Sequence, residues 1–182
     1  DLKVFKGNLK KQGYISEVKS VLSEFAQYGV DFERLDDFMK EVPPESYLHY
    51  KLDDIRTIYE KFEEYLSEKY ITKEEMLDVL SDAVPYSDIL KGSVVAMDGF
   101  TGFTPVQNRL IGELFSVCEK VMITVTMDGR ENPYVYEHPY QIFALGKQMV
   151  TSLMKIAGEK KTEIEEPICL FERPVYRFRD CS

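Results

Sequence analysis

One carboxylate, Asp98, directly follows an apolar run, a position where catalytic and ligand-binding residues are often found. Residues 94–97 precede it as a short, continuous apolar run, which predicts a strand buried on both faces. Asp98 would then lie at the carboxyl end of that strand, the edge where open α/β sheets bind ligands. Gly99 and Gly102 allow the chain to turn directly after the strand. A carboxylate placed in this way could hold Mg²⁺ or act as the nucleophile in phosphoryl transfer.

The elements around Asp98 must alternate between strands and helices to position it. Thr104 predicts a helix cap, with Pro105 in the first turn of the helix that follows. The β-branched run 121–126 predicts a second buried strand, so strand, helix and strand would form a parallel crossover. Two further elements are predicted downstream: a helix over 142–157 that ends at Gly158, and a short strand over 168–171.

The N-terminal half of the chain predicts helices throughout. Apolar residues recur at helical spacing over 13–28, 31–41 and 46–69, and Gly29 follows the first of these segments as a C-cap. Thr72 and Glu75 form a capping-box pattern before one more helix. We therefore predict an α/β protein with two domains: an all-helical domain over residues 1–88 and a partial α/β domain over residues 89–182.

Composition narrows the functional classes. The 182 residues include 23 basic and 32 acidic side chains, giving a net charge of −9, whereas nucleic-acid modules are usually basic. Three widely spaced cysteines and two histidines make a structural zinc site unexpected and fit a reducing cytoplasm. No apolar run approaches the length of a membrane span. The chain begins at Asp1 rather than Met, which suggests a piece of a longer protein.

Other candidate contacts are aromatic or basic. The tail offers the best local candidate for binding DNA or a partner, through Arg173, Tyr176, Arg177 and Arg179. The aromatic residues of segment 46–69 could stack on single-stranded DNA, although such a stripe is more often core. The tyrosines of segment 132–140 could contact a partner or a base, but ordering that loop against its own domain is the commoner use.

The sequence lacks the signatures of several enzyme classes. There is no GxxxxGK[ST] loop to cradle phosphates, no nucleophile elbow and no HExxH pattern. One alternative is a small, stand-alone, Mg²⁺-dependent phosphoryl-transfer enzyme centred on Asp98, but Phe100 stands where the common DxD pattern has its second Asp. Another alternative is a helical interaction module without a nucleotide or DNA role.

A resemblance to a known family favours a different function. The segment Asp98-Gly99-Phe100-Thr101-Gly102-Phe103-Thr104-Pro105-Val106-Gln107 resembles the DGFTGFTPxQ segment of AddB (RexB), a component of bacterial helicase–nuclease complexes. That segment is similar to the Walker B motif of UvrD-like helicases. Supporting resemblances cover most of the chain, including Gln12-Gly13-Tyr14-Ile15 and Lys51-Leu52-Asp53-Asp54-Ile55.

The chain departs from the helicase pattern at the residues that matter for hydrolysis. Gly99 stands where the motif has its catalytic Glu, and Gly102 where a later Asp would be. Asp128-Gly129-Arg130-Glu131 lacks the Gln that follows the next helicase strand. The resemblance therefore implies a helical insertion (1B-like) and part of a helicase core (1A-like), with a degenerate Walker B-like segment, no catalytic residue and no metal site.

The resemblance also implies what the parent protein does. It would be the B subunit of an ATP-dependent helicase/exonuclease, a cytoplasmic DNA-binding hydrolase that repairs double-strand breaks by homologous recombination. Its partner would be the motor–nuclease A subunit, in a heterodimer. ATP, Mg²⁺ and an iron–sulfur cluster are implied for the parent, but none of them for these residues, which would support the DNA path and contact the partner subunit.

Overall fold

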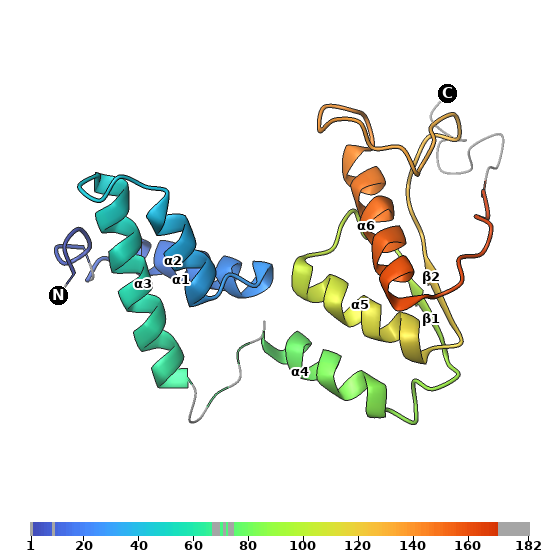
Figure 1. Ribbon diagram of the computed structural model, residues 1–182, viewed down its shortest axis with the longest axis horizontal. Coiled ribbons are helices and arrows are strands. Elements are labelled where there is room, and N and C mark those ends of the chain that lie inside the picture. Colours follow the sequence, from blue (N-terminus) through green and yellow to red (C-terminus); the bar gives the residue numbers. More distant parts are fainter. Residues whose placement is uncertain (1, 9, 67–69, 71, 73–74, 171–182) are drawn as a thin grey trace. The chain divides into compact units, whose positions relative to one another are not determined.

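The computed structural model describes residues 2–8, 10–66, 70, 72 and 75–170. The described residues form a mixed α/β structure with six α-helices and a small parallel sheet of two strands (Figure 1). In chain order the elements are α1 (Gln12–Tyr28), α2 (Phe32–Lys40), α3 (Tyr47–Leu66), α4 (Glu75–Ala83), a 3-10 turn (Val84–Tyr86), β1 (Val94–Met97), α5 (Pro105–Val117), β2 (Lys120–Ile123) and α6 (Ala144–Lys160).

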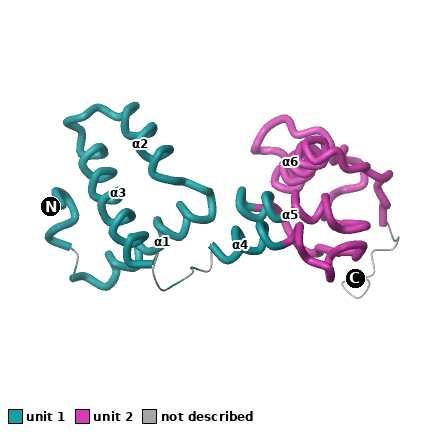
Figure 2. Tube along the Cα trace, turned by 60° about the horizontal axis from the view of Figure 1, so that its bottom comes forward, with its two compact units in different colours: residues 1–83, 104–110 teal, residues 84–103, 111–182 magenta. Residues whose placement is uncertain are grey.

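The chain divides into two compact units, coloured separately in Figure 2. Unit 1 comprises Asp1–Ala83 and Thr104–Leu110, and unit 2 comprises Val84–Phe103 and Ile111–Ser182. The predicted assignment of residues 1–88 and 89–182 to insertion and core domains stays a prediction.

Helix ends in unit 1 follow the signals in the sequence. Gly29 ends α1 in the left-handed conformation, with φ of 61°, and Asp31 caps α2 by accepting a hydrogen bond from the Arg34 backbone N–H at 2.9 Å. The capping box before α4 is confirmed: Glu75 accepts from the Thr72 backbone N–H at 2.6 Å, and Thr72 Oγ1 accepts from the Glu75 backbone N–H at 3.2 Å. Of the predicted segment 46–69, residues 67–69 lie outside the described ranges.

The core of unit 1 is built on α3. Tyr59 is buried, its ring centroid lies 5.7 Å from that of Phe25 and 4.7 Å from that of Phe32, and its hydroxyl donates to the Val30 carbonyl at 3.3 Å. Leu22, Leu35 and Leu52 are buried in the same unit. The middle of each predicted apolar stripe is therefore core, whereas other stripe residues, such as Ile15 and Phe38, are 54% and 50% exposed.

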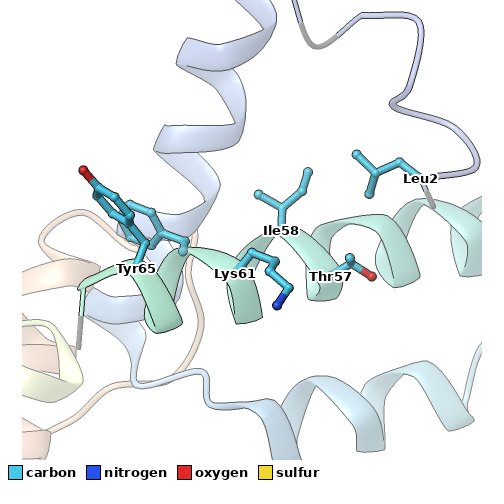
Figure 3. Close-up of a pocket in the computed structure, with 6 residues that line it drawn as sticks. Leu2, Thr57, Ile58, Lys61 and Tyr65 are labelled. Carbon is cyan, nitrogen blue, oxygen red and sulfur yellow. The ribbon is translucent and has the colours of Figure 1, made fainter. Parts of the chain in front are cut away.

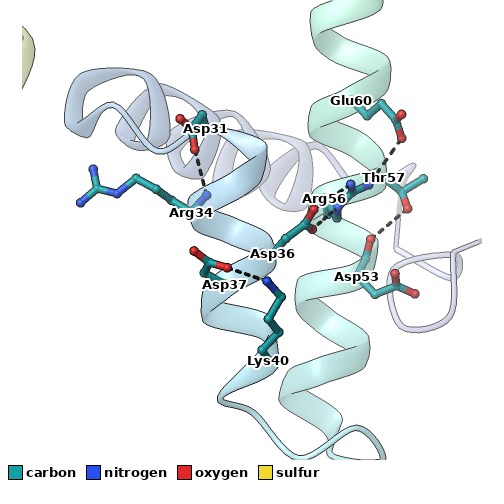
Figure 4. Close-up of polar contacts among 9 residues, drawn as sticks. All are labelled: Asp31, Arg34, Asp36, Asp37, Lys40, Asp53, Arg56, Thr57 and Glu60. Carbon is teal, nitrogen blue, oxygen red and sulfur yellow. Dashed lines mark hydrogen bonds and ion pairs between the residues drawn. The ribbon is translucent and has the colours of Figure 1, made fainter.

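A charged contact joins α2 to α3 on the surface of unit 1 (Figure 4). The Arg56 guanidinium donates to both carboxylate oxygens of Asp36, at 2.5 and 3.1 Å, and also lies 3.8 Å from Glu60. The two-point geometry fixes the orientation of the arginine. It holds the pKa of Asp36 below its usual range, chiefly through the hydrogen bonds from Arg56.

The N-terminal segment is held to α3 by one buried carboxylate. Asp54 is only 1% exposed and accepts three hydrogen bonds from the backbone N–H groups of Lys3, Val4 and Phe5, at 2.7, 2.7 and 2.8 Å. Burial alone would raise the pKa of Asp54, but the three donors outweigh it, so the pKa is lowered. Asp54 therefore remains charged and satisfied inside the unit.

In unit 2, β1 and β2 pair in parallel, as the sequence predicted, with Val94 opposite Lys120 and Met97 opposite Ile123. The expectation that both strands are buried on both faces is wrong. Val94 and Met122 are 55% and 43% exposed, so the described residues cover one face of the sheet and leave the other exposed. An apolar run cannot by itself tell a strand covered on one face from a strand covered on both.

Several predicted boundaries in unit 2 also need correction. The second strand ends at Ile123 rather than at residue 126. Helix α6 begins at Ala144 and continues through Gly158 to Lys160, because Lys161 adopts the left-handed cap conformation, with φ of 57°, and its N–H bonds the Gly158 carbonyl. Residues 168–170 form no strand, and residue 171 lies outside the described ranges.

Helices α5 and α6 approach closely within unit 2. A Cβ atom built on Gly112 would lie 3.2 Å from the Ile156 side chain, so only a hydrogen fits there easily. Next to it, Lys160 contacts Glu113 at 2.8 Å. Ile111 and Leu114 of α5 and Met149 and Ala157 of α6 are buried apolar residues of unit 2.

Candidate functional site

Asp98 lies directly after β1, at the carboxyl edge of the parallel pair, where the sequence placed it. Its carboxylate accepts a hydrogen bond from the hydroxyl of Thr124, which follows β2 at the same edge. The Thr124 backbone N–H donates to the Met97 carbonyl at 3.0 Å and extends the ladder. Sequence reasoning missed Thr124, although a polar residue after the second parallel strand should share an edge with Asp98.

The turn after Asp98 begins with a backbone conformation that favours glycine. Gly99 has φ of 80°, a conformation that residues with a Cβ atom rarely adopt, whereas Gly102 has no positive φ. Nothing lies within 4 Å of a Cβ atom built at either position, so the obstacle at Gly99 is backbone conformation rather than space. The structure thus explains why glycine stands directly after Asp98.

Gly99→Glu is therefore expected to destabilise unit 2 more than Gly102→Glu. We expect Gly99→Glu to lower the free energy of unfolding by about 1–3 kcal/mol, the usual cost of backbone strain at one residue. Gly102→Glu adds the same charge and side chain three residues later without that strain, so it serves as the matched control. Urea unfolding followed by circular dichroism measures both, and equal losses would contradict the role of the Gly99 conformation.

Phe100 and Thr101 line a groove within unit 2. Phe100 lies 5.0 Å from the Phe103 ring, and the groove continues past Val125 and Thr126 to residues 139–146, which include Phe143. Gly146 allows the start of α6 to approach the floor of the groove, because a Cβ atom there would lie 3.3 Å from Val125. The turn that follows Asp98 thus forms one wall of an aromatic-lined groove.

Gln107 has a local structural role that the sequence analysis overlooked. Its side-chain oxygen accepts from the Thr104 backbone N–H at 2.9 Å, and its own N–H donates to Thr104 Oγ1 at 3.4 Å. Together they form a capping box at the start of α5, and the Thr-x-x-Gln spacing was a sufficient signal for it. The segment passes from unit 2 to unit 1 between Phe103 and Thr104.

Residues 128–131, the turn that follows β2, are held by pairs of charged side chains. Asp128 accepts from the Arg130 backbone N–H at 2.9 Å and pairs with the Arg130 guanidinium at 2.6 Å. Glu131 instead pairs with Lys147 of α6 at 2.6 Å. Lys147 was not singled out from the sequence, although a lysine four residues from Phe143 and three from Val150 interrupts the apolar face of that helix.

A second groove lies on α3 in unit 1 (Figure 3). It is lined by Leu2, Thr57, Ile58, Lys61, Phe62 and Tyr65. Tyr65 is 70% exposed and Phe62 is 37% exposed, whereas Tyr59 is core. The aromatic stripe predicted for this helix is therefore core in its middle and exposed near its end.

The remaining sequence candidates differ in where they lie. Tyr140 is 92% exposed and does not pack against the described residues of the domain, whereas Tyr134 and Tyr136, at 44% and 37% exposed, are partly covered. Arg173, Tyr176, Arg177 and Arg179 lie outside the described residues. Within the described ranges, no three His, Cys, Asp or Glu side chains gather as metal ligands would. No described helix has the length and apolar character required to cross a membrane.

The described residues form a mixed α/β protein, with a helical unit and a parallel strand pair. A turn that contains Asp98 and two glycines follows β1, at the carboxyl edge of the sheet. A family model described as "ADDB, N-terminal" matches residues 1–182. The chain belongs to this AddB N-terminal family, as the resemblance in the sequence predicted.

Curated relatives carry names that agree with this family. A protein of Lachnoclostridium phytofermentans, named as the B subunit of an ATP-dependent helicase/deoxyribonuclease, is 41% identical over 92% of this chain. Proteins of the same name from a Thermoanaerobacter species and from Clostridium acetobutylicum are 34% and 32% identical over 98% and 99% of the chain. The chain spans about 15% of the length of each of these three relatives.

Proposed function

We propose that this chain is part of the B subunit of an ATP-dependent helicase/exonuclease that processes double-strand DNA ends for recombinational repair. The names of the curated relatives support this assignment. Because those names describe one subunit of a complex, they also point to a second, which we propose is the motor–nuclease A subunit of a heterodimer. The complex would act in the cytoplasm and would bind DNA along a path that includes both subunits.

Within that complex, we propose that these residues form a scaffold rather than a hydrolytic centre. The observation that carries this proposal is the Asp98 turn. Its carboxylate is engaged by Thr124, and the next residue is Gly99 with φ of 80°, a position that disfavours the catalytic glutamate of an ATPase motor. The helices of unit 1 would form the 1B-like insertion, and the strands and helices of unit 2 part of a 1A-like core.

The cofactors implied for the parent protein do not fit the residues of this chain. A nucleotide–Mg²⁺ site needs a phosphate-binding loop and lysine, which this sequence lacks, and Asp98 has no carboxylate beside it in the Gly99 position. The iron–sulfur cluster that the family implies has four cysteine ligands, whereas this sequence has three cysteines. ATP, Mg²⁺ and the cluster would therefore be held by other parts of the parent protein or by its partner.

An ATPase assay tests the scaffold role. With ATP and Mg²⁺, the purified chain is expected to release phosphate no faster than buffer alone. In the complex of the full-length B and A subunits, Asp98→Ala is expected to leave DNA-dependent ATP hydrolysis within about twofold, because no developing charge is stabilised at Asp98.

The opposite results would support the alternative, a Mg²⁺-dependent phosphoryl-transfer enzyme centred on Asp98. Phosphate release by the purified chain that Asp98→Ala abolishes would overturn the scaffold role. Asp128→Ala is the control, since Asp128 is an acidic residue of the neighbouring turn whose partner is Arg130. ATP-dependent DNA degradation by the A subunit alone, at the rate of the complex, would overturn the assignment to the B subunit.

A further inference from the structure

Lys147 is a buried lysine that the proposed function does not use. Its side chain is 4% exposed, and its ammonium group lies 2.6 Å from a carboxylate oxygen of Glu131, which is itself 43% exposed. Lysines are seldom this deeply buried unless they are paired, because an unpaired charge in such a site is costly. The contact with Glu131 therefore offsets the cost of burying the Lys147 ammonium group.

The pair ties a long irregular segment to a helix. Residues 124–143 connect β2 to α6 without helix or strand (Figure 1), and Glu131 lies within them. Two side-chain contacts, Asp128 with Arg130 and Gln141 with Glu137, join residues of the segment to each other, and Thr124 bonds Met97 and Asp98 where the segment begins. The Glu131–Lys147 contact instead reaches α6, and it shortens the free span of a loop whose ordering costs conformational entropy.

The segment held in this way supplies one wall of the groove beside the Asp98 turn. Pro139, Gln141 and Phe143 line the groove, together with Phe100 and Thr101 of the turn. Phe143 has φ of 65°, a strained conformation for a residue with a Cβ atom, so its surroundings must impose it. This conformation lies at the N-cap of α6, so the wall of the groove joins the helix through a strained residue.

We propose that Glu131 and Lys147 form a latch that fixes segment 128–143 against α6 and thereby builds the groove. With the latch closed, the aromatic wall stands beside the Asp98 turn. With the latch open, the segment loses its side-chain anchor on α6 and the wall loses its fixed position. The shape of the groove in unit 2 thus depends on one ion pair that lies outside the groove. This device goes beyond the scaffold role and does not depend on it.

Hydrogen exchange of the whole chain tests the latch. Lys147→Met removes the charge but keeps an unbranched apolar side chain in the buried site. We expect backbone amides of residues 128–143 to exchange about tenfold faster or more in this variant, while amides of α5 keep their rates. Lys155→Met is the matched control, because Lys155 lies on the same helix, is 79% exposed and lies 3.9 Å from the carboxylate of Glu159. It should change nothing in residues 128–143.

A double-mutant cycle keeps the test decisive. Glu131→Gln should speed exchange in the same residues, and combining it with Lys147→Met should add nothing, because both changes break one contact. Unchanged exchange of residues 128–143 in Lys147→Met would overturn the latch, and so would effects that simply add in the double variant. If Lys147→Met does not fold, Glu131→Gln decides alone: faster exchange confined to the segment supports the latch, and unchanged or uniformly faster exchange overturns it.

Discussion

Asp54→Ala is expected to lower the free energy of unfolding of unit 1 by about 3 kcal/mol. The substitution removes the carboxylate that accepts hydrogen bonds from the backbone N–H groups of Lys3, Val4 and Phe5. Because Asp54 is only 1% exposed, these three donors lose their acceptor in a buried site. Hydrogen bonds to charged groups contribute about 1.5–3 kcal/mol each before the surroundings relax. Urea unfolding followed by circular dichroism measures the loss.

The neighbouring aspartate provides the control. Asp53 is adjacent in the sequence but is 39% exposed, and it contacts the Lys3 ammonium at 3.0 Å. Asp53→Ala should cost less than about 1 kcal/mol, as exposed ion pairs usually do. Equal losses from the two substitutions would mean that the three backbone contacts of Asp54 contribute nothing specific.

The same carboxylate gives the stability a defined dependence on pH. The folded-state pKa of Asp54 is lowered relative to its unfolded value of about 3.9, because three backbone donors outweigh the effect of burial. Its contribution is therefore fully present above the unfolded pKa and is lost as the pH falls through the lower, folded pKa. Between about pH 6 and pH 2, the wild-type protein should lose more stability than Asp54→Ala.

Tyr59→Ala should be the most damaging change in the core of unit 1. It removes an aromatic ring that is 9% exposed and lies against Phe25 and Phe32, leaving a cavity between α1, α2 and α3. Large-to-small aromatic substitutions in cores cost about 3–5 kcal/mol, and we expect a loss in that range from urea unfolding.

Tyr59→Phe separates the ring from the hydroxyl. It keeps the packing and removes only the hydrogen bond to the Val30 carbonyl at 3.3 Å, so it should cost about 1 kcal/mol. If Tyr59→Phe were as damaging as Tyr59→Ala, the hydroxyl rather than the ring would hold the helices together, which would contradict the packing described for this core.

Local signals in the sequence predicted the local structure well. Gly29 ends one helix and the Thr72–Glu75 pair begins another, as the sequence predicted, because caps act within a few residues of themselves. The parallel pairing of the two strands also followed from the strand–helix–strand order. These features need no knowledge of distant contacts.

Features that depend on contacts between distant residues were not predicted. The open face of the sheet depends on which elements cover it, and the apolar runs of β1 and β2 carry no record of that. Asp54 was noted only as part of a family motif, because its partners lie about 50 residues earlier in the chain. Lys147 was missed for the same reason, since its partner Glu131 lies in an irregular loop.

The candidate site was predicted in part. Asp98 lies at the predicted strand end, but Gln107, taken as part of a helicase-like motif, serves as a helix cap. The sequence showed that Gly99 lacks a carboxylate, whereas its positive φ became visible only in the structure. The residue type at position 99 can be read from the sequence, but a backbone conformation that disfavours a side chain there cannot.

That backbone has a consequence for how such a protein could evolve. A glycine codon such as GGA becomes a glutamate codon through a single base change, so an acidic side chain could arise at position 99 in one step. The φ of 80° means that this side chain would first weaken the fold, before any neighbouring change reshaped the turn to suit it. Gaining an acid there would need several steps in a particular order, which favours keeping the glycine.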